Sequence, residues 1–487
     1  MKLIATGLAT VLALTAFHTD AAPKKAPVSA SGAVAAPVPV EDQAAALRDA
    51  ALTANGAYDF LSELTTRFGP RPAGSDSEKR AAEWSAMRLK ELGFQNVHIE
   101  SFPLHVWARG GPETIAITGE FAQPLVGVSL GGSTAGEVEG EAVMFDTYQE
   151  FLDSKADVTG KIVVILQPMA KASNGSGYGR MSGTVRGKGQ LEAQKRGAVG
   201  YVMRSLSTDN NRFAHAGASA WTDGKGIPAM AISAPDASQL SRIKVLQKAG
   251  KGGPVRISMK TTGQFLGLKT SQNVVADLVG SEHPEQVIVV GGHLDSWDLG
   301  TGAIDDGAGV AITMAAAKVM MDQGVKPKRT IRVVFWGSEE VSQPAGDTTE
   351  TGGGAFREAH KSELSNYVAH AESDFGADKL NNFALLPTDD TGFVTKLSNL
   401  LYPLGIYYDA KATPNGGEDS GAMNGFVPAF DLNQDGYRYF DTHHTANDTF
   451  DRIDPQQLNQ NVAAYTATLW LMANTDVRFK LPPKEAH

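Results

Sequence analysis

The stretch VIVVGGHLDSWDLGTGAIDDGAG, residues 287–309, joins a hydrophobic run to an acidic, glycine-rich segment. Val287 to Val290 are all β-branched, which predicts a buried β-strand. One histidine and four aspartates follow this strand directly. Because ligands of open α/β sheets bind beyond the carboxyl ends of the strands, the acidic groups at this strand end predict a binding site.

Strand and helix patterns on both sides of this stretch predict an α/β fold. Residues 272–280, 329–337 and 367–374 are short hydrophobic runs typical of buried strands. Residues 309–324 and the region around 462–474 are longer and have the apolar content of buried helices. The expected fold is therefore of the α/β class.

A long segment of different character interrupts this α/β pattern. Residues 107–265 consist of short strand-like runs separated by glycine-rich turns, with one helix expected among them. We predict a β-rich insertion here, between a first part of the α/β domain, residues 42–106, and its main part, residues 266–487. In the first part, Ser75 with Glu78 forms a capping-box pattern, which predicts the start of a helix.

The N-terminal residues resemble a targeting segment. Lys2 precedes the apolar run Leu3 to Phe17, which is too short to span a membrane and suits a secretory signal. We expect residues 1–22 to be a signal peptide and residues 23–41, rich in Ala and Pro, to be a linker. The mature protein is expected in the periplasm or outside the cell, without a membrane anchor.

Composition restricts the classes of ligand. The chain of 487 residues has a formal net charge of −10, which argues against nucleic acid and anionic membranes as partners. It contains no cysteine. A metal site must therefore use His, Asp and Glu, which favours hard or borderline ions such as zinc, manganese or magnesium.

Acidic and histidine residues follow three predicted strands. His293 and Asp295 follow the first strand, the pair Glu339–Glu340 the second, and Asp374 the third. Any one of these acids alone is more simply explained as a helix cap or a solvated loop residue. Their repeated position at strand ends predicts one convergent site.

The inventory of these side chains suits two divalent cations. Two cations roughly 3.5–4 Å apart repel each other, and a shared carboxylate offsets that repulsion. Such a site also needs further N or O ligands and a free carboxylate that accepts a proton from water. These residues complete that inventory: His293, Asp305, Glu339, Glu340, Asp374 and His444. Asp306, by contrast, is expected to cap the helix that follows it.

Four motifs resemble a known family. GGHLDSWDLGTGAIDDGAG, WGSEE, ESD and HHTANDT are similar to motifs of the two-zinc exopeptidases, which include bacterial leucyl aminopeptidases and plasma glutamate carboxypeptidase. The similarity to plasma glutamate carboxypeptidase is greatest and extends from about Asp42 to Asn474. The insertion resembles a protease-associated domain through the segments GKIVVI, KRGAVGYV and IPAMAIS.

The resemblance implies a mixed β-sheet flanked by helices, and it also implies a role for each candidate ligand. His293 and Asp374 would hold one zinc ion, and Glu340 and His444 would hold the other. Asp305 would bridge the two ions. The chain would therefore bind two Zn²⁺.

The resemblance also implies the neighbouring roles. Glu339 would be the general base, and Asp295 would form a hydrogen bond with the nitrogen of His293 that faces away from the metal. His444 rather than His443 would be the ligand, since it lies four residues before Asp448 in the family's H-x-x-x-D-T pattern. The peptide bond between Asp305 and its neighbour Asp306 is expected to be cis.

The implied activity is zinc-dependent hydrolysis of terminal peptide bonds by a hydroxide that bridges the metals. An aminopeptidase or a dipeptidase is favoured. The alternatives are a glutamate-carboxypeptidase-like exopeptidase, a single-zinc glutaminyl cyclase and a non-catalytic binding protein on the same fold. The expected partner is a peptide substrate, and the family suggests a homodimer.

Overall fold

The computed structural model describes residues 38–344 and 351–481, and every element named below lies in the unit that begins at Pro39. The predicted signal peptide and most of the predicted linker lie outside the described residues. Among the residues that are described, no helix is both long enough and apolar enough to cross a membrane.

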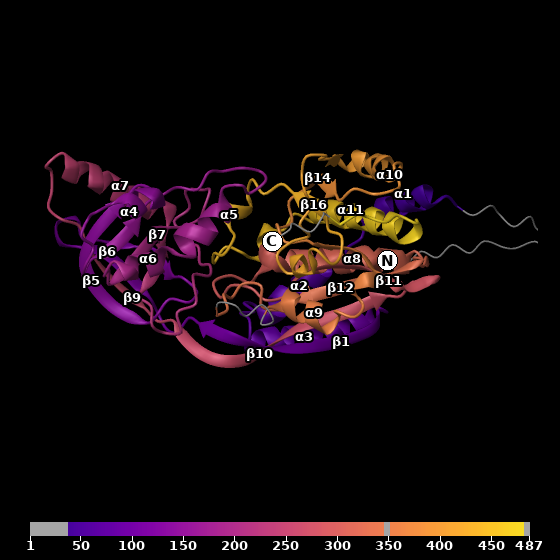
Figure 1. The fold of residues 1–487 in the computed structure, drawn as a ribbon, viewed down its shortest axis with the longest axis horizontal. Helices are drawn as coiled ribbons and strands as arrows, with labels where there is room; N and C mark the ends of the chain where they lie inside the picture. The colour runs from indigo at the N-terminus through magenta and orange to yellow at the C-terminus, as the bar shows by residue number, and fades with distance from the viewer. Residues whose placement is uncertain (1–37, 345–350, 482–487) are drawn as a thin grey trace, which may run out of the picture. The chain divides into compact units, whose positions relative to one another are not determined.

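A five-stranded mixed sheet forms the centre of the α/β part, in the order β1-β10-β12-β11-β13 (Figure 1). Its strands are β1 (Gln95–Ala108), β10 (Gln264–Leu278), β11 (His283–His293), β12 (Arg329–Trp336) and β13 (Tyr367–Glu372). Strand β11 runs parallel to both β12 and β13, whereas β10 is antiparallel to β12 and to β1. The predicted mixed sheet is confirmed.

Alternate residues of β11 are buried on opposite faces of this sheet. Ile288 and Val290 belong to a large core shared with helices, whereas Val287 and Val289 belong to a second core that includes Phe356. Successive strand residues point to opposite faces, and a strand covered on both faces is therefore hydrophobic throughout. This explains the uninterrupted β-branched run in the sequence.

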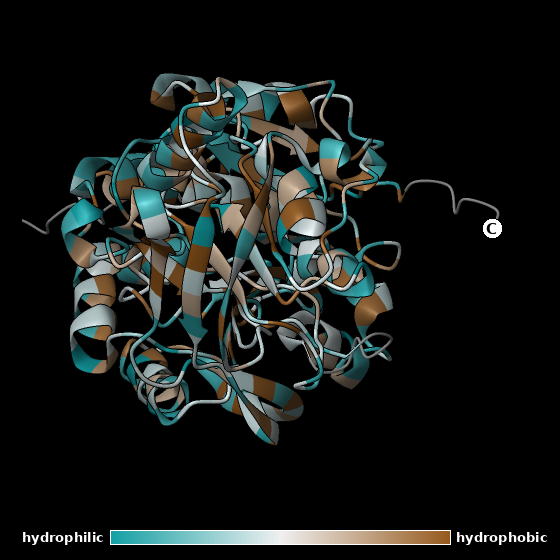
Figure 2. Ribbon diagram, turned by 90° about the vertical axis from the view of Figure 1, so that its left-hand side faces the viewer, coloured by the Kyte–Doolittle hydropathy of each residue, from teal (hydrophilic) through white to brown (hydrophobic). Residues whose placement is uncertain are grey.

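Helices pack around the sheet. They are α1 (Val40–Ala51), α2 (Gly56–Phe68), α3 (Asp76–Glu91), α8 (Ala308–Asp322), α9 (Gly352–Ala359), α10 (Phe393–Leu401) and α11 (Pro455–Asn474). Helix α8 contacts α2 and α11, and both α8 and α11 are buried along most of their length. In Figure 2, hydrophobic and hydrophilic residues alternate along several outer helices, as expected where one helix face is buried. A small sheet, β15-β14-β16, adds β14 (Leu380–Leu385), β15 (Tyr407–Tyr408) and β16 (Phe430–Gln434).

The chain between β1 and β10, residues 109–263, is called the insertion below. It contains an eight-stranded sheet in the order β3-β2-β9-β5-β6-β7-β8-β4. The strands are β2 (Thr114–Thr118), β3 (Gln123–Leu125), β4 (Gly127–Ser129), β5 (Gly136–Phe145), β6 (Ile162–Ile165), β7 (Gly200–Arg204), β8 (Ala229–Ile232) and β9 (Arg256–Thr261). The insertion also contains α4 (Tyr148–Asp153), α5 (Tyr178–Met181), α6 (Gly189–Lys195) and α7 (Ala234–Lys248), so the expectation of a single helix is wrong.

Three parallel strand ends meet at one edge of the central sheet. Strand β11 ends at His293, β12 at Trp336 and β13 at Glu372, and β11 lies between the other two. The segments that follow these strands therefore emerge side by side, which brings together the acidic motifs that the sequence separates.

The predicted cap of α3 gives a test of local stability. The Ser75 hydroxyl accepts a hydrogen bond from the Glu78 N–H, at 3.2 Å. Ser75→Ala leaves this donor without its partner, and we expect the free energy of unfolding to fall by about 1 kcal/mol. Denaturant unfolding measures the change, with Ser75→Thr as the control that keeps the hydroxyl. An unchanged midpoint in Ser75→Ala would contradict the capping role.

Candidate metal centre

His293, Asp305 and Asp374 meet at the carboxyl ends of β11 and β13. The Nε2 atom of His293 lies 3.1 Å from Oδ1 of Asp305 and 3.5 Å from Oδ1 of Asp374. His293 is the last residue of β11, and Asp374 follows the end of β13. All three side chains are buried or nearly so. The structure thus brings together one half of the predicted ligand set.

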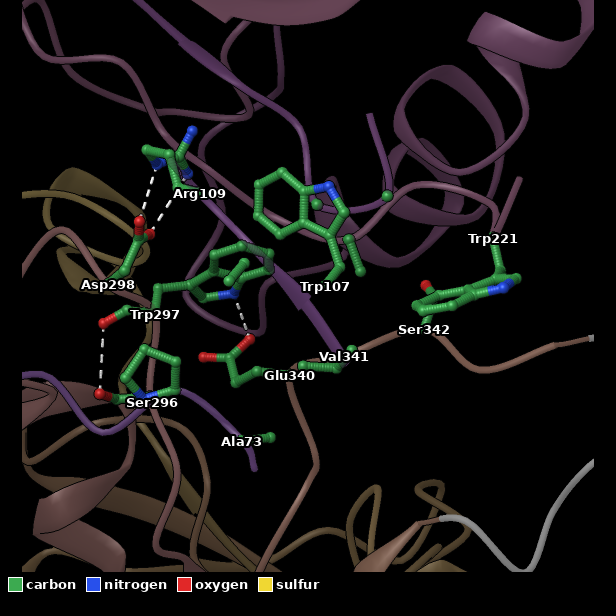
Figure 3. Close-up of a pocket in the computed structure, with 15 residues that line it drawn as sticks. Ala73, Trp107, Arg109, Trp221, Ser296, Trp297, Asp298, Glu340, Val341 and Ser342 are labelled. Carbon is green, nitrogen blue, oxygen red and sulfur yellow. Dashed lines mark hydrogen bonds and ion pairs between the residues drawn. The ribbon is translucent and has the colours of Figure 1, made fainter. Parts of the chain in front are cut away.

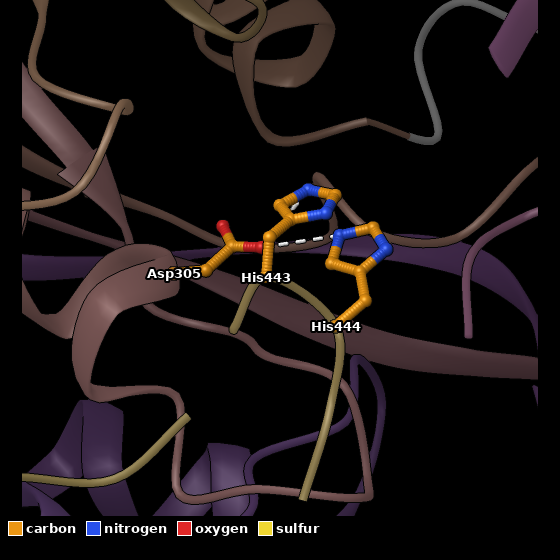
Figure 4. Close-up of side chains that lie close together, drawn as sticks. All are labelled: Asp305, His443 and His444. Carbon is orange, nitrogen blue, oxygen red and sulfur yellow. Dashed lines mark ion pairs between the residues drawn. The ribbon is translucent and has the colours of Figure 1, made fainter. Parts of the chain in front are cut away.

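The second half lies on the other side of Asp305. Nε2 of His444 is 3.1 Å from Oδ2 of Asp305 and 3.0 Å from Oε2 of Glu340. Asp305 therefore directs one carboxylate oxygen toward His293 and the other toward His444. Figure 4 shows Asp305 facing the two adjacent histidine rings.

His443 also approaches Asp305. Its Nε2 is 3.4 Å from Oδ2 of Asp305, and its ring stacks on that of His444 with centroids 3.5 Å apart. Of the two histidines, only His444 also forms an ion pair with Glu340 among the described residues. The contact with Glu340 is the feature that distinguishes His444 as the candidate ligand.

Unpartnered oxygens show that this cluster fits cations. Oδ2 of Asp305, Oε1 of Glu340 and Oδ1 of Asp374 are buried, and none has a hydrogen-bond partner among the described residues. Histidine nitrogens lie near two of these oxygens, at 3.1 Å from Oδ2 of Asp305 and 3.5 Å from Oδ1 of Asp374. Ligand atoms of His293, Asp305 and Glu340 lie within 4.8 Å of one another, and those of Asp305, His443 and His444 do so as well. Buried carboxylates without partners are costly, and a metal ion offsets that cost. The donor set suits two borderline cations that share Asp305.

The charges in the cluster influence one another strongly. Burial, followed by the charge of Glu340, raises the pKa of Glu339 well above its ordinary value. Burial, followed by the charge of Asp305, also raises the pKa of Glu340 well above its ordinary value. Burial would also raise the pKa of Asp305, but the neighbouring histidines outweigh it and hold that pKa well below its ordinary value.

Asp306 supports the backbone at the start of α8. Its Oδ1 accepts a hydrogen bond from the N–H of Gly309 at 2.9 Å, and its Oδ2 accepts one from the N–H of His293 at 3.1 Å. Asp306 thus accepts an N–H of the first turn of α8, as expected of a capping residue, although Gly307 occupies the N-cap position. The peptide bond between Asp305 and Asp306 is cis, as expected. A Cβ atom at Gly309 would lie 1.7 Å from the carbonyl oxygen of Ser373, so only glycine fits this close approach.

Asp295 holds the turn that carries the two glutamates. Its carboxylate accepts hydrogen bonds from the N–H groups of Glu339, at 3.0 Å, and Glu340, at 3.2 Å. Nδ1 of His293 lies 2.9 Å from the main-chain oxygen of Asp295 and 3.6 Å from its carboxylate. The main chain of Asp295 is thus the nearer partner of His293, and the carboxylate chiefly orients the Glu339–Glu340 segment.

A pocket of about 340 Å³ opens onto this cluster. Acidic groups and Arg186 of the insertion both line it. The lining residues include Tyr178, Arg186, Asp305, Glu339, Glu340, Asp374, Phe375, Glu418, Tyr439, Phe440, His443 and His444. The volume is that of a small-ligand site.

Comparison with known proteins identifies the family. The profile described as peptidase family M28 matches residues 273–469. Carboxypeptidase Q of Bos taurus is 32% identical over 427 residues, which cover 87% of this chain and 86% of that protein. This chain belongs to peptidase family M28. The resemblance inferred from the four motifs is confirmed.

Solved structures agree with this assignment. A peptidase M28 precursor from Shewanella amazonensis SB2B has a TM-score of 0.83 and 39% identity, covering 91% of this chain and 99% of that chain. An aminopeptidase from Aneurinibacillus sp. strain AM-1 shares the fold, with a TM-score of 0.58 and 18% identity over 91% of this chain and 98% of that chain. As a member of this family, the present chain is a metallo-exopeptidase that hydrolyses peptide bonds.

Arg71 is a buried residue near the M28 site that sequence reasoning missed. The Arg71 side chain donates hydrogen bonds to the carbonyl oxygens of Leu294, at 2.6 Å, Thr301, at 2.6 Å, and Gly302, at 2.9 Å. It thereby connects both ends of the loop between His293 and Asp305. A single arginine between two prolines has no periodic pattern that would reveal this role.

Asp448 supports the bridging aspartate. Its carboxylate accepts hydrogen bonds from the N–H groups of Ala303, at 2.8 Å, Ile304, at 2.6 Å, and Asp305, at 3.2 Å. In the sequence, Asp448 was only the reference position that selected His444 as the ligand. In the structure, Asp448 links the His444 segment to the turn that carries Asp305. This function follows from the fold and not from the spacing.

Replacing Asp448 tests this link. Asp448→Asn keeps the size of the side chain but presents an amide group where a second acceptor oxygen stood. We expect the metal-free protein to lose about 1–3 kcal/mol of unfolding free energy, because a buried N–H loses its acceptor. Denaturant unfolding measures the loss, with the exposed Asp451→Asn as the control. Equal stability of the two variants would exclude the proposed link.

Proposed function

We propose that this M28 exopeptidase is a two-zinc dipeptidase. The observation that carries the proposal is that Arg186 and the carboxylate–histidine cluster face the same pocket. The cluster supplies the hydrolytic centre, and the guanidinium supplies a partner for the free carboxylate of a short substrate. The name carboxypeptidase Q, borne by relatives of this chain, is consistent with recognition of a carboxyl end.

The ligand assignment follows the two halves of the cluster. His293 and Asp374 would hold one zinc ion, Glu340 and His444 the other, and Asp305 would bridge them. The short approaches of His293 and His444 to opposite oxygens of Asp305 support this division. Zinc binds such nitrogen and oxygen ligands and would activate water at neutral pH and polarise the scissile carbonyl.

Glu339 is proposed as the group that moves the proton. Its carboxylate lines the pocket and forms no hydrogen bond with any described residue. Asp295 fixes its main chain, so the side chain is held at the reaction centre while its oxygens stay available. Glu339 accepts the proton of the attacking water and delivers it to the leaving amine.

Arg186 is proposed to bind the substrate carboxylate. It is 9% exposed and donates hydrogen bonds to the Tyr178 hydroxyl, at 2.7 Å, and the Ala218 carbonyl, at 3.1 Å. No carboxylate of the described residues forms an ion pair with it, although acidic residues line the same pocket. A guanidinium binds a carboxylate through two parallel hydrogen bonds, and a buried one without an ionic partner is suited to a ligand.

The acidic residues of the pocket suit the amino end of the substrate. Glu339, Asp374 and Glu418 line it, and their negative charge favours a free α-ammonium group. A site that reads both ends selects dipeptides over longer chains. An aminopeptidase, which recognises only the amino end of its substrate, does not require the Arg186 guanidinium.

The place of action and the assembly state are part of this proposal. Lys2 and the apolar run Leu3 to Phe17 support export to the periplasm or the extracellular space. The substrates would then be peptides found outside the cytoplasm. Family resemblance alone supports a homodimer.

Exchange of each glutamate separates the two proposed roles. Glu339→Gln should keep two zinc ions per chain and lose turnover by at least 10²–10⁴-fold, since it removes the proton acceptor. Glu340→Gln should lose zinc as well as activity, since it removes a ligand. Metal analysis combined with dipeptide hydrolysis measures both effects. Loss of zinc in Glu339→Gln, or full zinc occupancy in Glu340→Gln, would show that the roles are wrongly assigned.

Exchange of Arg186 tests recognition of the carboxyl end. Arg186→Lys keeps the positive charge but removes the two parallel donors. Losing one charged hydrogen bond weakens substrate binding by about 1.5–3 kcal/mol. We therefore expect KM for free dipeptides to rise by roughly 10- to 150-fold, with KM for the same dipeptides amidated at the carboxyl end unchanged. Arg180→Lys, at an exposed position of the same segment, is the control. If both kinds of substrate lose affinity equally, Arg186 does not read the carboxylate.

A further inference from the structure

The insertion forms direct hydrogen bonds with His444. The N–H of Ala216 donates to the main-chain oxygen of His444 at 2.9 Å, and the carbonyl oxygen of Ala216 lies 3.3 Å from Nδ1 of His444. A proton on Nδ1 leaves the lone pair of Nε2 directed at the Asp305–Glu340 side. His444 also has a φ of 59°, a left-handed conformation that is uncommon for residues other than glycine.

The insertion also reaches Glu340 through Trp297. The indole Nε1 of Trp297 donates a hydrogen bond to Oε2 of Glu340, as drawn in Figure 3, and its ring lies 5.5 Å from that of His444. Gly131 of the insertion packs directly against this indole, because a Cβ atom there would lie 2.4 Å from the ring. Trp297 and Ala216 share a hydrophobic cluster, which joins the two contacts.

The other ligands are held without the insertion. His293 is fixed by the main-chain oxygen of Asp295 and by Asp306, both from the α/β part of the chain. Within the described residues, no hydrogen bond or ion pair connects residues 109–263 to His293, Asp305 or Asp374. Among the proposed ligands, the insertion is therefore hydrogen-bonded only to His444 within the described residues, and it reaches Glu340 through Trp297.

We propose that the insertion is a structural part of one metal position and not of the other. It holds Glu340 through Gly131 and Trp297, and it holds His444 through Ala216. The metal at the Glu340–His444 pair then depends on the insertion, whereas the metal at His293–Asp374 does not. Trp297 is a positioning residue, since it acts through Glu340. This inference rests on the ligand pairs proposed above.

Two variants disturb the contact between Trp297 and Glu340, one in the indole itself and one in the insertion that packs against it. Trp297→Phe removes the N–H donor and keeps an aromatic ring, and Gly131→Ala displaces the indole from the side of the insertion. Trp470→Phe is the matched control for the first, because the indole N–H of Trp470 has no hydrogen-bond partner among the described residues. Gly111→Ala is the control for the second, because a Cβ atom at Gly111 meets nothing within 4 Å.

The measurement is the affinity of each of the two zinc sites in the full-length protein. Titration of the metal-free enzyme with zinc against a competing chelator gives two dissociation constants, and cobalt absorption spectra follow each site in turn. In both variants we expect one site to weaken by roughly 10- to 100-fold, the usual effect of losing a partner of a metal ligand, and the other to stay unchanged. Both controls should match the wild type.

Three results would overturn the inference. Equal weakening of both sites would mean that the contact stabilises the enzyme in general, and unchanged affinities would mean that the insertion does not support the metal position. A wild-type enzyme that binds only one zinc ion would overturn the two-zinc assignment and this inference with it. The stoichiometry of the wild type thus separates a failure of the proposed function from a failure of the inference alone.

Discussion

The carboxylate of Asp305 is the group around which the site is arranged. Its two oxygens face His293 on one side and His444 on the other, each at 3.1 Å. A buried carboxylate in such a position is unfavourable unless cations or hydrogen bonds compensate its charge. Asp448 supports the main chain of Asp305, and Arg71 supports the loop that precedes it. Much of the surrounding structure thus serves to hold one acidic turn in place.

The central sheet makes this arrangement possible. Because β11 lies between the parallel strands β12 and β13, the segments after all three strands emerge at one edge. A mixed sheet covered by helices on both faces is rigid, and catalytic groups placed at its strand ends hold their geometry better than groups on mobile loops. The insertion then approaches this edge from outside the sheet and adds Arg186 to the pocket and Ala216 to the His444 segment. In the proposed function, hydrolysis and substrate selection would therefore use two different parts of the chain.

Prediction from the sequence succeeded for elements that have a local pattern of residue types. The β-branched run of β11 and the capping pair Ser75–Glu78 are local signals, and the structure agrees with both. Prediction failed for α7 of the insertion, whose apolar residues lie on several faces: Leu240 and Ile243 are buried, whereas Val245 is 65% exposed. Such a helix has no clear hydrophobic stripe, so its periodicity does not distinguish it from the short strands around it.

The sequence by itself determined the fold class, the family and the inventory of acids and histidines at the strand ends. These features depend on residue type and spacing, which the sequence displays directly. Only the tertiary structure decided that Asp295 orients the glutamate turn, that Trp297 reaches Glu340 and that Ala216 supports His444. The last contact uses the main chain of Ala216, which almost any other residue would offer equally. The other two contacts join segments far apart in the chain. Local composition does not predict interactions of this kind, because the fold alone brings the partners together.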